Sequence, residues 1–387
     1  MDSTFVYVGT YTGPKSQGIY LFKLDDSAGN VMLVPVGLAA EASNPSFLEL
    51  DPKRRLLFAV NEVSRFDGKP TGAVSAFAID RTTGTLAPIN QQPSMGTSPC
   101  HLVLDRAGRY LLVANYGSGS VSVLPVAPDG RLGAATDVVQ HAGRSVNPER
   151  QQGPHAHCVT IDRANRFVFV CDLGLDKVLA YRFDAQRGKL TPHDPPSVQA
   201  KPGAGPRHMA FRPDYRFAYV VNELSSTVTA FRYEADAGVL REVQTISTLP
   251  EHADGANSGA EVDVHPSGKW LYVSNRGQNS VAAFSIDSAR GTLKWVDELK
   301  TGGLTPRHFG IDPSTHYVLV GNQASDTILI ARVDASTGRL TTSGVVAPAP
   351  SPVCVKFLPP AGAPSREREQ LAHIAAGRRG DGARHGR

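Results

Sequence analysis

The fold class that the sequence predicts is all-β, a seven-bladed β-propeller with four antiparallel strands in each blade. One unit recurs along almost the whole chain: a P-x-H or similar start, an apolar strand that ends in V-x-N, a V-x-x-F strand and a G-x-L turn. The units follow one another about every 50 residues, and the two ends of the chain supply complementary parts of one more unit. These three observations together indicate a closed ring of blades.

The period is the first observation. The residue that ends the second strand marks six units, as Asn61, Asn115, Asp172, Asn222, Asn275 and Asn322. Successive markers are 54, 57, 50, 53 and 47 residues apart. A period in this range is typical of a propeller or another repeat array. Because each period holds four strand-like segments and no helical one, a helical solenoid is a poor alternative.

The chain ends predict how the ring closes. The N-terminal segments FVYVGTYT and GIYLFKLD resemble second and third strands whose first strand is missing, and SPVCVKFLP near the C-terminus is an unattached first strand. Joined, they complete a seventh blade and leave no open sheet edge along the circle. We therefore expect residues 1–360 to form the propeller, with its ring closed by strands from both termini.

Composition and charge agree with this organisation. With 41% hydrophobic residues, the 387-residue chain can bury a large core, and a ring in which blades pack only on their neighbours needs no second domain. Residues 361–387 carry six Arg against three acidic residues, which is +3 of the formal +4. We expect this segment to be a disordered basic tail. The nearly neutral propeller offers no electrostatic argument for nucleic acid.

Other sequence features predict the protein's surroundings. The start MDSTFVYVGTYT lacks the pattern of a signal peptide, and no run of about 18 apolar residues occurs, so we expect a cytoplasmic protein without membrane association. A closed ring leaves no edge for a partner to cover, which favours a monomer. The cysteines form no C-x-x-C pair and are predicted to be buried, reduced thiols: Cys100, Cys158, Cys171 and Cys354.

The repeat also predicts where a site would lie. The innermost strand begins, and the second strand ends, at the same edge of each sheet. Residues at P-x-H and just after V-x-N should therefore meet around the mouth of the central channel. These positions hold Glu62, His101, Tyr116, His155, His157, Arg207, His208, Glu223, Glu261, Arg276, Arg307, His308 and Gln323.

Three arginines at one mouth indicate an anion site, because a guanidinium group offers paired donors to phosphate or carboxylate. The alternative is that Arg207, Arg276 and Arg307 only form ion pairs with the neighbouring glutamates across blade boundaries. A structural alternative also applies to His101 and His308, since many propeller blades use a histidine at this place to hold a turn.

A metal site is the next possibility. His155 and His157 form an H-x-H pair, but no cluster of carboxylates accompanies them. The nearby arginines would also repel a cation. We therefore expect neither a metal nor another cofactor.

The segment from Gly203 to Phe231, GAGPRHMAFRPDYRFAYVVNELSSTVTAF, resembles the bacterial 6-phosphogluconolactonases of the seven-bladed propeller type. The resemblance is most specific at G-A-G-P-R-H-M and V-N-E-L. It extends over about residues 4–358 through Y-V-G-T-Y-T, N-P-S-F, A-N-Y-G-S-G-S-V, H-A-H-C-V and S-N-R. It implies hydrolysis of 6-phospho-D-glucono-1,5-lactone to 6-phosphogluconate in the oxidative pentose phosphate pathway, with a small anionic sugar-phosphate lactone as substrate.

The resemblance also implies a site built from His157, Arg207, Glu223 and Arg276, with His155 as the alternative to His157. Lactone hydrolysis needs an activated water, oxyanion stabilisation and a phosphate-binding group. In our hypothesis Glu223 or His157 is the general base, Arg276 and His208 face the oxyanion, and Arg207 or Arg307 binds phosphate. The predicted catalytic residues are thus Glu223, His157, Arg276 and His208, and the predicted substrate-binding residues are Arg207, Arg307, His308, His101, Tyr116 and His155.

Two other functions remain open at this stage. The same family includes the fungal carboxy-cis,cis-muconate cyclases, in which the arginines would bind substrate carboxylates during a cycloisomerisation. The chain could also be a non-catalytic binding platform, as many repeat proteins are. Inward Arg, His and Glu argue against a platform, which would more naturally carry apolar and aromatic anchors on its outer rim. The closeness of the two specific segments favours the phosphogluconolactonase.

Overall fold

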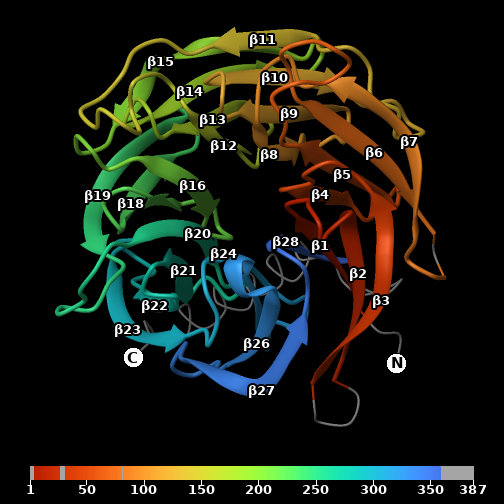
Figure 1. The fold of residues 1–387 in the computed structure, drawn as a ribbon. Helices are drawn as coiled ribbons and strands as arrows, with labels where there is room; N and C mark the ends of the chain where they lie inside the picture. The colour runs from red at the N-terminus through yellow and green to blue at the C-terminus, as the bar shows by residue number, and fades with distance from the viewer. Residues whose placement is uncertain (1–3, 27–30, 81, 359–387) are drawn as a thin grey trace, which may run out of the picture.

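The computed structural model describes residues 4–26, 31–80 and 82–358, so the predicted tail at 361–387 lies outside the described residues. The described chain forms seven four-stranded antiparallel sheets arranged in a ring, which confirms the predicted fold class (Figure 1). Its one helical segment is a short 3₁₀ turn, η1 (Gln323–Ser325). The part of the chain that the structure describes has no helix with the length and apolar content of a membrane span.

We number the blades from the one that follows the N-terminal strands. Blade 1 consists of β4 (Leu48–Asp51), β5 (Leu56–Asn61), β6 (Ala73–Ile79) and β7 (Leu86–Pro93). Blade 2 consists of β8 (Pro99–Leu104), β9 (Tyr110–Asn115), β10 (Ser120–Pro125) and β11 (Asp137–Gln140). Blade 3 consists of β12 (Ala156–Ile161), β13 (Phe167–Asp172), β14 (Lys177–Asp184) and β15 (Lys189–Gln199). Blade 4 consists of β16 (Pro206–Phe211), β17 (Phe217–Asn222), β18 (Thr227–Glu234) and β19 (Val239–Ser247).

The remaining blades complete the ring. Blade 5 consists of β20 (Ser258–Val264), β21 (Trp270–Arg276), β22 (Ser280–Ile286) and β23 (Leu293–Lys300). Blade 6 consists of β24 (Pro306–Ile311), β25 (Tyr317–Asn322), β26 (Thr327–Val333) and β27 (Leu340–Pro348). Blade 7 consists of β28 (Pro352–Leu358), β1 (Thr4–Thr10), β2 (Gly18–Asp25) and β3 (Met32–Glu41). Strands pair in this order, from the centre of the ring outward (Figure 1).

Blade 7 closes the ring as predicted. Its innermost strand β28 comes from the C-terminal part of the propeller and pairs antiparallel with β1, with Val355 opposite Val8. The innermost strands also contact one another around the full circle, from β4 through β8, β12, β16, β20, β24 and β28 back to β4. The inner edge of each sheet is therefore short and protected within the ring, which limits edge-to-edge association.

The core lies between neighbouring sheets. The second strands β5, β13, β17 and β25 are buried along their whole length, because both faces of each sheet pack on an adjacent blade. This is why the sequence shows continuous apolar runs such as Leu56–Val60 there. Each buried cluster joins strands of adjacent blades; for example, Phe217 and Tyr219 of blade 4 pack with Leu271 and Phe284 of blade 5.

The G-x-L part of the repeat is a turn that fits against the neighbouring blade. Its glycines have φ between 63° and 87°, a region that favours glycine, and they are Gly84, Gly130, Gly188, Gly238, Gly291 and Gly338. A Cβ on Gly291 would lie 2.1 Å from the ring of Phe217. The Tyr219 hydroxyl donates to the Gly291 carbonyl at 3.1 Å. The turn glycine thus sets the packing of one blade on the next.

The V-x-N part of the repeat has a structural role. Asn115 and Asn275 are buried and donate from Nδ2 to the carbonyls of Ser94 and Thr248, at 3.1 and 2.8 Å. In blade 3 the marker is Asp172, whose Oδ2 lies 2.6 Å from the buried His141 Nδ1. These bonds fix the end of each second strand, and with it the residue that follows at the mouth of the ring.

Candidate active site

The P-x-H segments place side chains at the centre of the ring through a repeated irregularity of the ladder. In blade 4, Pro206 pairs with Asn222 and His208 with Val221, so Arg207 is an extra residue between two paired ones. The same shift occurs at Cys100, His157 and Arg307 in blades 2, 3 and 6. A bulge of this kind redirects a side chain out of the regular alternation.

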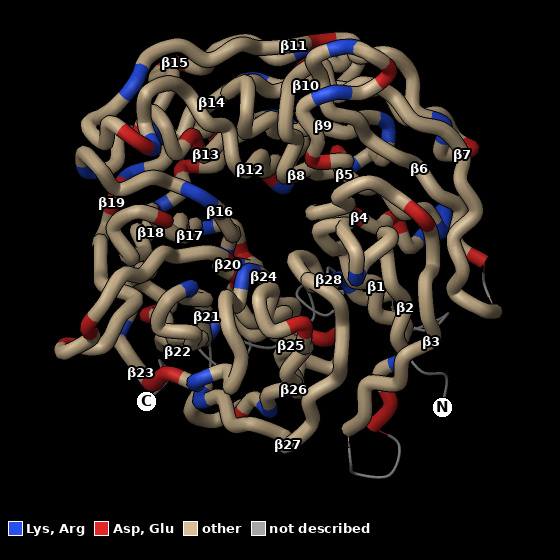
Figure 2. Tube along the Cα trace, viewed as in Figure 1, with Lys and Arg blue, Asp and Glu red and all other residues tan. Residues whose placement is uncertain are grey.

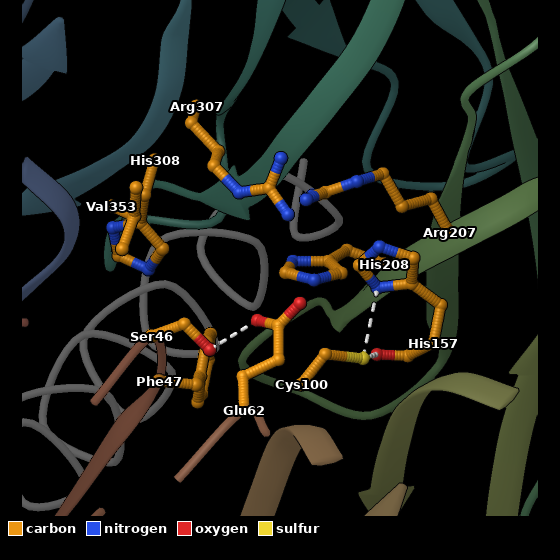
Figure 3. A pocket seen from close by; sticks show the side chains of 10 residues that line it. All are labelled: Ser46, Phe47, Glu62, Cys100, His157, Arg207, His208, Arg307, His308 and Val353. Carbon is orange, nitrogen blue, oxygen red and sulfur yellow. Dashed lines mark hydrogen bonds between the residues drawn. The ribbon is translucent and has the colours of Figure 1, made fainter. Parts of the chain in front are cut away.

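These bulge residues line an axial pocket that encloses about 240 Å³ of atom-free space, part of it open to solvent. Figure 3 shows the side chains that line it, which are Ser46, Phe47, Glu62, Cys100, His157, Arg207, His208, Arg307, His308 and Val353. Six of them occupy the x position of P-x-H or its equivalents N-P-S-F and S-P-V-C. Figure 2 shows the charged positions of β16, β20 and β24 beside the centre of the ring.

The side chains of Arg207 and Arg307 come from different directions and bring their guanidinium groups close together in the pocket (Figure 3). Arg207 is 2% exposed; its Nε donates to Glu223 Oε2 at 3.0 Å and its Nη1 to the Ala260 carbonyl at 2.6 Å. Arg307 donates from Nη2 to the Tyr11 hydroxyl at 2.9 Å. Among the described residues, no carboxylate lies within ion-pair distance of Arg307. Its positive charge is therefore available to an anionic ligand.

Glu62 brings a carboxylate into the same pocket. Its Oε2 accepts hydrogen bonds from Ser46 Oγ and, at 3.0 Å, from the Tyr11 hydroxyl. Tyr11 thereby links Glu62 to Arg307. The carboxylate points toward the guanidinium groups in Figure 3. Burial raises the pKa of Tyr11, so its hydroxyl keeps its proton and stays a donor.

Glu223 is the centre of an arginine cluster next to the pocket lining. Its Oε2 lies 3.0 Å from Arg207 Nε and 2.8 Å from Arg276 Nη2, and its Oε1 lies 2.7 Å from Arg150 Nη2. Burial opposes ionisation of Glu223, but the charges of Arg276 and Arg207 and the bond from Arg150 outweigh it and hold the pKa at about 2. Burial lowers the pKa of Arg276 to about 10. Both groups remain charged at neutral pH.

The imidazoles of the pocket are neutral. Burial and the charge of Arg207 lower the pKa of His157 and of His208 well below the ordinary value, and burial lowers that of His308 to about 3. His157 Nδ1 lies 3.8 Å from Cys100 Sγ. Burial also raises the pKa of the Cys100 thiol, so the pair is a neutral thiol beside a neutral imidazole. All four cysteines are free and buried, as predicted.

The rim of the pocket carries a stacked pair. The rings of Tyr116 and His155 lie 4.5 Å apart and 17° from parallel, and His155 Nδ1 is 2.9 Å from the Tyr116 carbonyl oxygen. Arg150 also donates to the Tyr116 hydroxyl at 3.2 Å. Because Arg150 contacts both Tyr116 and Glu223, the long segment before blade 3 reaches the mouth of the site.

The predicted site residues thus lie in four places in and around the pocket. The pocket lining includes His157, Arg207, His208, Arg307 and His308. His101 packs on Phe47 with ring centroids 4.0 Å apart, Tyr116 and His155 form part of the rim, and Glu223 and Arg276 pair next to Arg207.

Arg207 and Arg276 therefore do form ion pairs, as the alternative expected. Both pair with the same residue, Glu223, and each arginine does not have a glutamate of its own. Glu62 instead binds hydroxyl groups. Glu261 lies against two imidazoles, 3.0 Å from His208 Nδ1 and 3.3 Å from His308 Nε2.

Some site residues were missed by sequence reasoning. Ser46, Phe47, Cys100 and Val353 line the pocket from positions equivalent to the arginines and histidines of other blades, and the repeat alignment was the signal that could have found them. Arg150 had no such signal, because it lies outside the repeat. Among residues 4–26, 31–80 and 82–358, no group of three or more His, Cys, Asp or Glu is arranged to hold a metal ion.

Fold and pocket define a seven-bladed propeller with an axial site rich in arginine and histidine. The family model described as "Lactonase, 7-bladed beta-propeller" matches residues 5–357. The chain belongs to this lactonase family.

Similar proteins cover nearly the whole chain. The 6-phosphogluconolactonase of Bacillus subtilis is 37% identical over 352 residues, which cover 91% of this chain and 97% of that protein. A provisional 6-phosphogluconolactonase of Bacteroides fragilis has a TM-score of 0.85 at 37% identity, covering 92% of this chain and 98% of that structure. The structure of the periplasmic gluconolactonase of Pseudomonas aeruginosa matches with a TM-score of 0.86 at 34% identity, and the match covers 93% of this chain and 100% of that structure.

Proposed function

We propose that this protein hydrolyses 6-phospho-D-glucono-1,5-lactone to 6-phosphogluconate in the axial pocket. The observation that carries the proposal is the pair of guanidinium groups, Arg207 and Arg307, that lie beside neutral imidazoles in one pocket. The name of the Bacillus subtilis relative supports the same substrate. A phosphorylated lactone offers one anionic group for the arginines and one electrophilic carbonyl for attack by water.

Arg307 is the stronger candidate for the phosphate. Its guanidinium is linked only to the Tyr11 hydroxyl among the described hydrogen bonds, whereas Arg207 already binds Glu223 and a backbone carbonyl. Paired N–H donors on one planar group suit a phosphate better than the point charge of a lysine. Arg207, fixed by Glu223, supports the negative charge that develops on the lactone carbonyl oxygen.

The base that activates water is one of the pocket imidazoles, His157 or His208. Both have a pKa well below the ordinary value because of burial and Arg207, so both are unprotonated at neutral pH and able to accept a proton. Water attacks C1, the bond between C1 and the ring oxygen breaks, and the proton held by the imidazole passes to the departing ring oxygen. Glu223, bound by three arginines, is better suited to position guanidinium groups than to accept a proton.

The cellular setting follows from this substrate as a further part of the proposal. We place the reaction in the oxidative pentose phosphate pathway of carbohydrate metabolism, and in the cytoplasm, where sugar phosphates are made and consumed. A monomer suffices, because the inner sheet edges already face one another within the ring. The gluconolactonase name of the Pseudomonas aeruginosa neighbour makes the unphosphorylated lactone the second candidate substrate.

The test is the disappearance of freshly generated 6-phosphoglucono-δ-lactone, followed against its spontaneous hydrolysis. Glucono-δ-lactone and carboxy-cis,cis-muconate serve as comparators for the gluconolactonase and cyclase alternatives. The proposal expects a rate above the spontaneous one and the highest kcat/KM for the phosphorylated lactone. An equal or higher kcat/KM for either comparator contradicts the substrate assignment. If none of the three compounds reacts faster than it does spontaneously, the result supports the non-catalytic binding platform instead.

A further inference from the structure

We propose that Glu261 is a positioning residue that makes His208, rather than His157, the proton acceptor of the hydrolysis. The inference rests on the proposed function and assigns one of the two open candidates for the base. It comes from comparing equivalent positions in different blades of the same molecule.

Three histidines occupy the same place in the repeat, at the last position of P-x-H in blades 2, 4 and 6. In two of them the ring is held by the backbone of the next blade. The Val159 N–H approaches His101 Nδ1 at 3.5 Å, and the Val355 N–H donates to His308 Nδ1 at 3.2 Å. A nitrogen that accepts a hydrogen bond carries no proton, so this geometry places the ring proton of His101 and of His308 on Nε2.

His208 differs because blade 5 supplies a carboxylate at this place. Gly259 pairs with Asn275 and Val262 with Val273, so Glu261 occupies in β20 the position that histidine has in the other three blades. The Val262 N–H donates to Glu261 Oε1 at 3.2 Å, and Glu261 Oε2 lies 3.0 Å from His208 Nδ1. A carboxylate only accepts hydrogen bonds, so the His208 Nδ1 must carry the proton.

The consequence is a free lone pair on His208 Nε2. This atom is buried and has no hydrogen-bond partner among the described residues, although His208 lines the pocket. The Nε2 atoms of the other two histidines have neighbours, since that of His101 lies 3.6 Å from Cys158 Sγ and that of His308 lies 3.3 Å from Glu261 Oε2. Of the three equivalent rings, only His208 presents an unprotonated nitrogen without a partner.

The chemistry of the pair is that of a carboxylate that orients an imidazole base. Water loses a proton to His208 Nε2 as its oxygen bonds to C1, and the imidazolium that forms is stabilised by the Glu261 carboxylate at Nδ1. The proton then moves from Nε2 to the ring oxygen as the bond from C1 to that oxygen breaks. Glu261 takes up no proton in either step, and the product acid loses its proton to solvent.

The experiment uses kinetics with freshly generated 6-phosphoglucono-δ-lactone. His208→Asn keeps a side-chain donor toward Glu261 but has no atom in place of Nε2, so kcat should fall by ~10²-fold or more, the usual contribution of a general base. The exposed His252 lies between β19 and β20 and is not part of the pocket lining, so it serves as the matched control, His252→Asn, which should keep the wild-type rate. His157→Asn should lose less than His208→Asn.

Glu261→Gln tests positioning through the pH profile. Removing the carboxylate destabilises the His208 imidazolium, so kcat should fall at least ~10-fold and the acid limb of kcat/KM should move to lower pH. If Glu261 has only a structural role, Glu261→Gln lowers stability without moving the acid limb of kcat/KM. The titratable and charged groups that also face His208 are His101, His157, Cys158, Arg207, Arg307 and His308, and they are unchanged in this variant.

The outcomes separate the inference from the proposed function. If the wild type does not accelerate lactone hydrolysis, the proposed function fails. If the wild type is active but His157→Asn loses the rate while His208→Asn keeps it, or the acid limb of Glu261→Gln does not move, the inference is overturned. Histidine nitrogen NMR of the wild type gives a readout independent of activity. It should show His208 protonated on Nδ1 and His308 on Nε2, and the reverse assignment contradicts the inference.

Discussion

Glu223 makes a testable prediction about stability, because it is a buried carboxylate that holds three arginines. The contacts lower its pKa from the ordinary 4.5 to about 2. A depressed pKa means that folding stabilises the charged form, and a shift of this size corresponds to about 3 kcal/mol. The stabilisation is fully present above pH 4.5 and is lost as the pH falls through 2. Glu223→Gln should therefore lower the free energy of unfolding by about 3 kcal/mol at pH 7.

The assay is urea unfolding of both proteins at several pH values, with linear extrapolation to water. Urea is uncharged and does not screen the ion pairs as guanidinium chloride does. The gap between wild type and Glu223→Gln should narrow as the pH falls from 5 toward 2. Glu149→Gln, at an exposed position of the segment that carries Arg150, should leave stability within about 0.5 kcal/mol. An equally stable Glu223→Gln, or a gap that does not change with pH, refutes the reasoning.

The same variant separates two roles of Glu223 in catalysis. If Glu223 only positions Arg207, which keeps its bond to the Ala260 carbonyl, its replacement by glutamine should lower kcat by less than ~10²-fold, because the oxyanion contact is weakened and not removed. If Glu223 is the general base, kcat should fall by ~10²- to 10⁴-fold with little change in KM. Full activity of the variant removes the carboxylate from the mechanism altogether.

Three further predictions concern the phosphate, the thiols and the ring closure. Arg307→Met should raise KM for the phosphorylated lactone by ~10-fold or more and leave KM for glucono-δ-lactone nearly unchanged; equal effects on both substrates contradict a phosphate role. A thiol reagent should label no cysteine rapidly in the native protein and all four after denaturation, since each is free and buried; fast labelling of any thiol in the native state argues against this burial. A chain that ends at Pro350 lacks β28 and exposes the inner edge of β1, so it should aggregate or unfold, whereas a soluble, cooperatively folding product contradicts the closure argument.

Most of the fold could be predicted from the sequence because the same local pattern recurs from blade to blade. Burial on both sheet faces requires apolar second strands, and the turn between the third and fourth strands requires a glycine in the left-handed region. The blade that contains β1 needs a first strand, and the segment Pro352–Leu358 is a first strand without a blade. Pairing the two closes the ring.

The candidate site was only partly predictable, because the repeat gives the edge of the sheet but not the direction of each side chain. The bulge directs the x residue of P-x-H into the pocket, so Cys100 and Val353 line it although neither residue type suggested a site. Glu223 is close to the predicted place, but its three arginine partners depend on contacts with Arg150 and Arg276 that sequence spacing does not reveal. The distinction between His208 and His308 rests on a single residue of another blade, Glu261.

The measurement that tests the central claim most directly is a structure of the protein with 6-phosphogluconate, the product of the proposed reaction. The account predicts that the ligand occupies the axial pocket, with its phosphate at Arg307 and its carboxylate near Arg207 and His208. Binding outside the ring of P-x-H residues, or at the opposite face of the propeller, would contradict the account.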